Sequence, residues 1–231
     1  VATGAEQDGD GKLVYRRGAE AVPARQDKAR AEIAPVRLPE WALRPAPSEA
    51  RPPRPLAPSA MAEDREAAPA PSASARAAAE RGNLIHALLE RLPPVAPTQR
   101  RDAALRWLQA SGVGEHQKPE EIADLVCGLL GDDRFSALFG PDSLPEAPIA
   151  ATLPDGRVIA GTVDRLLVEA DRVLVIDYKT GRAPASTAEI PSAHRRQMSA
   201  YVEALSVIFP ARKVVAALLY TATATLFELA A

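Results

Sequence analysis

Apolar residues follow two different spacings along the chain, and the change between them separates a helical part from a strand-rich part. From about residue 72 to residue 139 they recur every three or four positions, as on one face of a helix. The first predicted helix ends at Leu92, the second begins after an N-cap at Thr98, and the third opens at Pro119. Gly82 lies inside the first of these helices and is a point at which it could break.

Beyond residue 145, short runs of β-branched and apolar residues replace the helical spacing and predict strands. Three strands joined by tight turns are expected first, then one helix, then two closing strands. Their predicted bounds are 146–153, 157–169 and 172–178 for the first three strands, 192–208 for the helix, and 213–220 and 225–229 for the last two strands. This order predicts an α/β fold with a mixed central sheet flanked by helices.

The first 72 residues have little periodic pattern and many prolines. Eleven of the chain's 22 prolines fall between Pro23 and Pro71, interleaved with alanine, arginine and glutamate. Such a stretch has too little apolar surface to offset the entropy lost on folding. We therefore expect an extended Pro/Ala-rich linker or connector over residues 1–72, with a docking point around Trp41, and one folded domain over residues 73–231.

Composition excludes several classes of function. The formal net charge of -2 excludes a uniformly basic nucleic-acid binder but allows a local basic patch. A single cysteine, Cys127, excludes a disulfide framework, a cysteine-ligated zinc site and an iron–sulfur cluster within the chain. No apolar run reaches the roughly 20 residues that span a membrane, and no signal-peptide pattern opens the sequence. A cytoplasmic location without membrane contact is therefore expected.

Charged residues interrupt the second and third predicted strands. If the connecting turn lies at residues 170–171, Asp164 and Asp177 face each other with Cβ atoms roughly 5 Å apart. Lys179 follows Asp177 by two residues and therefore points to the same face of the sheet. Two acids and one lysine thus converge, and directly opposed like charges destabilise a sheet.

Two explanations account for this convergence. In a buried salt-bridge cluster Lys179 neutralises one acid, which leaves the second acid as a costly unpaired charge. A divalent cation held by carboxylate oxygens, with a phosphate beside it, compensates both acids, and magnesium suits such an oxygen site. The second explanation is favoured because it leaves no charge unpaired.

Four more residues become candidates for a functional role only when they are considered together with this acidic site. His86 lies on the first helix and, taken alone, is typical of a structural histidine. Gln197 and Tyr201 are four residues apart and share one face of the helix over residues 192–208. Glu146 opens the strand before the hairpin and by itself resembles a solvated strand end.

Taken in order, these residues resemble the RecB-type nuclease domain of the PD-(D/E)XK superfamily. The resemblance covers about residues 73–229 and implies a restriction-endonuclease-like core. It rests on the series Gly82-x-x-x-His86, Glu146, Gly161-x-x-Asp164, Asp177-Tyr178-Lys179-Thr180-Gly181 and Gln197-x-x-x-Tyr201.

The resemblance also implies a role for each of these residues. The catalytic residues would be Asp164, Asp177 and Lys179. The metal ligands would be His86, Asp164, Asp177 and the backbone carbonyl of Tyr178, with Glu146 as an additional acid near the metal. The contacts to DNA would come from Gln197, Tyr201, Arg182 and Arg196, with Arg195 adding to the local positive charge.

The likeness extends into the Pro-rich segment, where Pro39-Glu40-Trp41 and Leu56-Ala57-Pro58-Ser59 resemble the connector of AddA-type helicase-nucleases. These enzymes act in bacterial recombinational repair of double-strand breaks. The resemblance implies an exonuclease domain, dependent on Mg²⁺ or Mn²⁺, that hydrolyses the phosphodiester bonds of DNA in the bacterial cytoplasm. Its expected partners are DNA, an AddB-type sister subunit and the helicase part of the same polypeptide.

The sequence contains no Gly-x-x-x-x-Gly-Lys-Ser/Thr motif, so ATP would act only through a helicase part outside this chain. Two other interpretations stay open. One is a catalytically silent nuclease-like domain that binds DNA or a partner subunit, and the other is an unrelated structural α/β domain.

Overall fold

The predicted change from helices to strands is reproduced in the computed structural model, which describes residues 6–7, 9–11, 13–14, 37–44, 55–58, 72–113 and 115–229. The chain divides into two units, Val1–Ala50 and Arg51–Ala231. In the first, β1 (Glu6–Gln7) pairs antiparallel with β2 (Leu13–Val14), and Glu40–Leu43 forms a 3-10 turn. The expected docking role of Trp41 concerns a side chain outside the described ones and stays a prediction.

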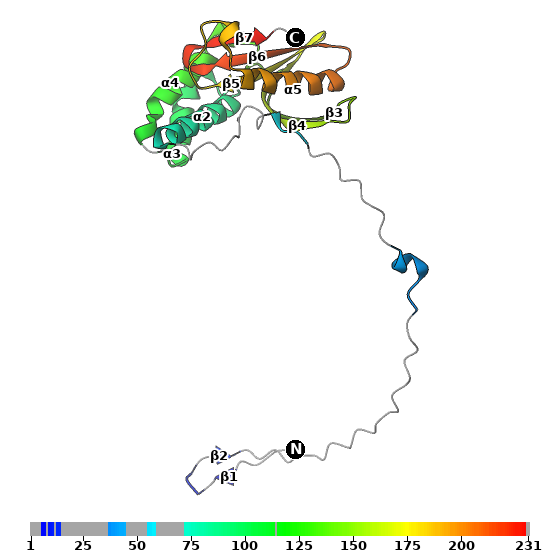
Figure 1. Cartoon of the computed structure of the whole chain (residues 1–231). Coiled ribbons are helices and arrows are strands. Elements are labelled where there is room, and N and C mark those ends of the chain that lie inside the picture. The colour runs from blue at the N-terminus through cyan, green and yellow to red at the C-terminus, as the bar shows by residue number, and fades with distance from the viewer. Residues whose placement is uncertain are drawn as a thin grey trace. The chain divides into compact units, whose positions relative to one another are not determined.

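A five-stranded mixed sheet forms the centre of the second unit (Figure 1). Its strands lie in chain order: β3 (Ser143–Thr152), β4 (Val158–Val168), β5 (Arg172–Lys179), β6 (Lys213–Tyr220) and β7 (Thr225–Leu229). Neighbouring strands are antiparallel except β5 and β6, which are parallel and joined by helix α5 (Ser192–Ile208).

Helices cover both faces of this sheet (Figure 1). On one face α2 (Ala73–Arg91), α3 (Arg100–Ala110) and α4 (Pro119–Leu130) bury a leucine-rich core against β4, β5 and β6. On the other face α5 packs on β3 to β6. The predicted α/β class with a restriction-endonuclease-like core is confirmed. None of the described helices combines the length and the apolar character needed to cross a bilayer.

Most predicted element bounds agree with the structure to within three residues, and two local predictions are wrong. Thr98 does not cap the second helix, because Pro97 starts a 3-10 turn that holds Thr98 and leads directly into α3. Helix α2 does not break at Gly82 and runs without interruption from its N-cap, Ser72, whose hydroxyl accepts the amide of Ala75. Pro119 opens α4 as predicted.

The register of the central hairpin is also as predicted. The ladder between β4 and β5 runs from the pair Arg165–Ile176 to the pair Val168–Val173, which is the register expected for a turn at residues 170–171. The next residues along both strands are Asp164 and Asp177. The two acids therefore lie at the point where the paired backbones begin to separate.

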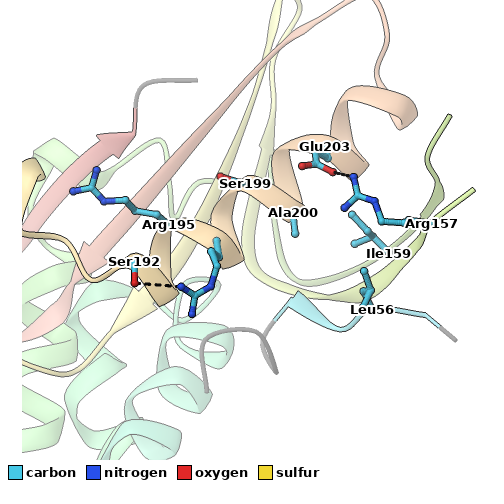
Figure 2. Close-up of a pocket in the computed structure, with 9 residues that line it drawn as sticks. Leu56, Arg157, Ile159, Ser192, Arg195, Ser199, Ala200 and Glu203 are labelled. Atoms are coloured by element: carbon cyan, nitrogen blue, oxygen red, sulfur yellow. Dashed lines mark hydrogen bonds and ion pairs between the residues drawn. The ribbon is translucent and has the colours of Figure 1, made fainter. Parts of the chain in front are cut away.

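The open edge of β4 before this point is partly covered by residues 55–58, here called the strap. Leu56 forms a parallel bridge to Ile159, donating its amide to the Val158 carbonyl (2.7 Å) and accepting the Ala160 amide (3.1 Å). Figure 2 shows Leu56 beside Ile159, facing α5 across a cavity of about 370 Å³. Most of residues 1–72 lie outside the described residues, so the predicted domain boundary stays a prediction, but the strap packs on the folded domain.

Gly161 permits the close approach of this strap. A Cβ atom at Gly161 would lie 3.1 Å from the Cδ atom of Pro58 and 3.8 Å from the Tyr201 ring. We therefore expect Gly161→Val to displace Pro58 and to lower the free energy of unfolding by about 1–3 kcal/mol, as overpacking does. Urea denaturation measures this loss. Gly128→Ala is the control, since nothing lies within 4 Å of its Cβ position, and equal stability of both variants would contradict the packing argument.

Candidate active site and metal centre

The site lies where β4 and β5 separate. At this point the Asp164 side chain, instead of the β4 backbone, accepts a hydrogen bond from β5. The Oδ2 atom of Asp164 accepts the amide of Tyr178 at 2.6 Å, across the gap between the strands. Its other oxygen, Oδ1, lies 3.3 Å from Nδ1 of His86. Asp164 thus links β4 both to β5 and to helix α2.

Glu146 lies directly across the β3–β4 ladder from Asp164, between the pairs Pro145–Arg165 and Ala147–Val163. Its backbone has φ 44°, in the left-handed region that non-glycine residues seldom occupy. Such a conformation costs on the order of 1–3 kcal/mol and is typical of functional sites. In this conformation Glu146 belongs to a close group of potential metal ligands. One ligand atom each of Glu146, Asp164 and His86 lies within 4.8 Å of the others.

Helix α2 brings His86 to this group through a close contact one turn earlier. A Cβ atom at Gly82 would lie 3.0 Å from the Thr180 hydroxyl oxygen, so a larger residue would have to push the Thr180 side chain aside where α2 approaches the end of β5. The Tyr178 ring packs edge-on against the His86 imidazole, with ring centroids 5.4 Å apart. The Gly-x-x-x-His spacing of the sequence is thereby explained as an approach point followed by a ligand-bearing position.

On the α5 side, Asp177, Gln197 and Lys179 form a closed set of polar contacts. Gln197 donates its Nε2 to Asp177 Oδ1 at 2.7 Å and accepts from Lys179 Nζ at 3.0 Å. Lys179 Nζ also lies 2.8 Å from Asp177 Oδ2, an ion pair whose angles are not those of a hydrogen bond. Asp177 and Gln197 are buried, whereas the Lys179 side chain keeps 16% of its surface exposed. The ammonium group is therefore fixed in position at the edge of the site.

Burial and the charge of Asp164 raise the pKa values of the two other acids of the site. Burial, and then the charge of Asp164, raises the pKa of Asp177 to about 6, against the opposing effect of Lys179. Burial and Asp164 likewise raise the pKa of Glu146. Burial lowers the pKa of His86, but its hydrogen bond to Asp164 and the nearby acids outweigh that effect and raise it above its ordinary value. The site thus has an excess of negative charge that a cation would relieve.

The donor atoms fit a divalent cation. The predicted ligands were His86, Asp164, Asp177 and the Tyr178 carbonyl, with Glu146 as an additional acid. The structure brings His86, Glu146 and Asp164 within ligand distance of one another, while the oxygens of Asp177 are engaged by Gln197 and Lys179. Two carboxylates and one imidazole are a donor set that divalent metals accept.

The predicted DNA contacts divide into buried and exposed side chains. Tyr201 is buried and donates its hydroxyl to the Thr162 carbonyl at 2.8 Å, so it supports β4 beside the site. Arg182 is exposed after β5, and Arg196 is exposed on α5, where it hydrogen-bonds to Ser192. Arg195 donates to the carbonyls of the turn before α5.

Two features of this region were not found by sequence reasoning. Arg165 follows Asp164 directly and is almost fully buried. Nothing in the pattern of the strand distinguishes it from an exposed polar residue. The strap was counted as part of the linker. In the sequence, Arg165 is marked only by its position after Asp164, and the strap only by the connector-like residues Leu56-Ala57-Pro58-Ser59.

One of three comparisons with known proteins shows the family of the chain. A search of curated proteins finds no match. Among solved structures, one titled "Crystal structure of SSO0001" shares 18% identity over 64% of this chain and 75% of that chain, with a TM-score of 0.29, a likeness too low to support any conclusion. The family model described as "PD-(D/E)XK nuclease superfamily" matches residues 59–229. This match spans the nuclease motifs from Gly82 to Tyr201, and the chain belongs to the PD-(D/E)XK nuclease superfamily.

Proposed function

We propose that this chain is a DNA nuclease domain that depends on a divalent metal, Mg²⁺ or Mn²⁺, and hydrolyses phosphodiester bonds. The observation that carries the proposal is the grouping of His86, Glu146 and Asp164 within 4.8 Å of one another, next to the fixed ammonium of Lys179. Superfamily membership supports a nuclease-like function in general. The choice of DNA and of these metals rests on the motifs and on the donor atoms.

The metal would be held by His86, Glu146 and Asp164, with Asp177 as a further ligand through Oδ2, the buried oxygen that accepts no hydrogen bond. When bound, the ion supplies Lewis-acid chemistry, lowering the pKa of a water molecule and polarising the phosphate. Asp164 keeps its link to the Tyr178 amide, so its other oxygen, Oδ1, is held in one orientation.

Lys179 supplies the second positive charge of the site. Its Nζ atom is oriented by Gln197 and Asp177, both of which are buried and packed. A preoriented ammonium stabilises charge that develops on the transferred phosphoryl group without having to reorganise during the reaction. Lys179 would therefore stabilise the transition state, and Gln197 would hold Lys179 in place.

We further propose that the chain is the exonuclease domain of an AddA-type helicase-nuclease that acts in double-strand break repair. This assignment is supported by the Asp177-Tyr178-Lys179-Thr180-Gly181 motif and by the connector-like residues before the domain. In this role a motor elsewhere in the polypeptide feeds a DNA strand to the site, and an AddB-type subunit is the partner. The exposed Arg182 and Arg196 would contact the phosphates of that strand.

The test is incubation of the chain with linear DNA in the presence of Mg²⁺, Mn²⁺ or a chelator. We expect cleavage with either metal and none with the chelator, because the acids are uncompensated without a cation. Covalently closed circular DNA is the control for an exonuclease, which needs an end. Metal binding without cleavage would instead indicate a catalytically silent domain, and equal cleavage with chelator would contradict metal dependence.

A further inference from the structure

Arg165 is the largest of the nearly fully buried side chains, with 2% of its surface exposed. Its Nε atom donates to the Tyr178 hydroxyl at 3.1 Å, and its Nη2 atom donates to the Leu89 carbonyl at 2.6 Å. Its guanidinium carbon lies 5.3 Å from the centre of the Phe139 ring. Within the described part of the chain, no carboxylate oxygen lies within 4.0 Å of its guanidinium nitrogens.

A buried arginine without a direct ion pair is energetically expensive, because charged groups lose their hydration in the core. The charge of Glu146 attracts Arg165, but only from beyond ion-pair distance. An apolar residue of similar size would fill the same space on this face of the sheet at lower cost. Two hydrogen bonds and one ring contact offset only part of the penalty. The presence of the guanidinium therefore calls for a contribution other than core packing.

The partners of Arg165 lie on the two elements that deliver the metal-binding residues. Leu89 is one turn beyond His86 on α2, and its carbonyl is fixed by Nη2 of Arg165. Tyr178 is on β5, its ring contacts His86, and its amide is held by Asp164. Arg165 itself follows Asp164 on β4, so one side chain joins α2, β4 and β5 directly behind the site.

From these contacts we infer that Arg165 is a positioning residue of the metal centre: by tying the Leu89 carbonyl and the Tyr178 hydroxyl together, it sets the distance between His86 and Asp164. This inference rests on the proposed metal-dependent function and names a residue that acts through others. The guanidinium donates to the two acceptors from two separate nitrogens at fixed positions, a geometry that the single nitrogen of lysine does not reproduce.

The test compares Arg165→Lys and Tyr178→Phe with the unchanged chain for Mn²⁺ affinity, followed by the electron paramagnetic resonance signal of free Mn²⁺. Loss of an outer contact to metal-binding residues costs roughly 10–100-fold in metal affinity, and we expect a loss of about 10-fold or more for Arg165→Lys. Tyr178→Phe keeps the ring against His86 and removes only the hydroxyl, so its effect should be in the same direction. The double variant should lose little more than Arg165→Lys alone, since both changes break the same connection.

Arg101→Lys is the matched control, because Arg101 forms an exposed ion pair with Asp124 far from any acid of the site, and it should leave Mn²⁺ affinity unchanged. Circular dichroism checks that each variant is folded, and if Arg165→Lys does not fold, Tyr178→Phe decides alone. Unchanged Mn²⁺ affinity in the folded variants would overturn the inference and leave the proposed function standing. Absence of Mn²⁺ binding in the unchanged chain would overturn both.

Discussion

Replacing Asp177 by alanine is expected to remove metal-dependent DNA cleavage while leaving the fold intact. Losing one member of a catalytic set costs on the order of 10⁴-fold or more in rate. The side chain is buried between Gln197 and Lys179, so no exposed group can substitute for its carboxylate. The initial rate of cleavage of linear DNA with Mg²⁺ at pH 8 measures the loss.

The variant should fold because the charged Asp177 does not stabilise the metal-free protein. Burial raises its pKa from 3.8 to about 6, so its contribution to stability is fully present below pH 3.8 and is lost as the pH rises through 6. At pH 8 the charged carboxylate therefore opposes folding. Asp171→Ala, in the exposed turn of the same hairpin, is the control and should keep full activity. Cleavage at the normal rate by Asp177→Ala would exclude this residue from catalysis.

Replacing Lys179 by methionine is expected to separate catalysis from metal binding. Methionine keeps an unbranched apolar stem and removes the ammonium, so the charge that stabilises the transition state is lost. We expect kcat to fall by about 10²–10³-fold, as for the loss of one preoriented donor, with little change in KM. Steady-state kinetics on linear DNA measure both constants.

Mn²⁺ affinity of the same variant provides the second measurement, and it should not decrease, because Asp177 loses a competing cation. Lys213→Met, an exposed lysine at the start of β6, is the control. A fall in kcat accompanied by an equal fall in metal affinity would show that Lys179 acts only by holding Asp177. An unchanged kcat would remove Lys179 from the catalytic set.

The hairpin was predictable from the sequence because its geometry is local. A short turn at residues 170–171 leaves one register that keeps the apolar residues of both strands on consistent faces, and that register brings Asp164 and Asp177 to the end of the ladder. Helix α5 was predictable for a similar reason, since its apolar stripe and its length agree. In both cases the decisive interactions join residues close together in sequence.

Three features were not predictable because they depend on contacts between distant segments. The backbone of Glu146 turns into the site at φ 44°, a conformation that no residue pattern around it demands. The burial of Arg165 depends on Leu89, which is 76 residues away in sequence. The pairing of Leu56 with β4 depends on the early separation of β5, which leaves the edge open. Thr98 was misassigned since Pro97 imposes a 3-10 turn that capping preferences alone do not foresee.

The parallel pairing of β5 with β6 has a consequence for the order in which the site is assembled during folding. The β3–β4–β5 meander, with its three acids, closes through short turns, whereas β6 can pair with β5 only after α5 has crossed the sheet. Closure over a longer loop costs more chain entropy, and such non-local pairing is intrinsically slow. We therefore expect the acids to come together before Gln197 on α5 orients Lys179. In that order the carboxylates reach their register before the lysine is oriented, so catalytic competence would depend on the docking of α5.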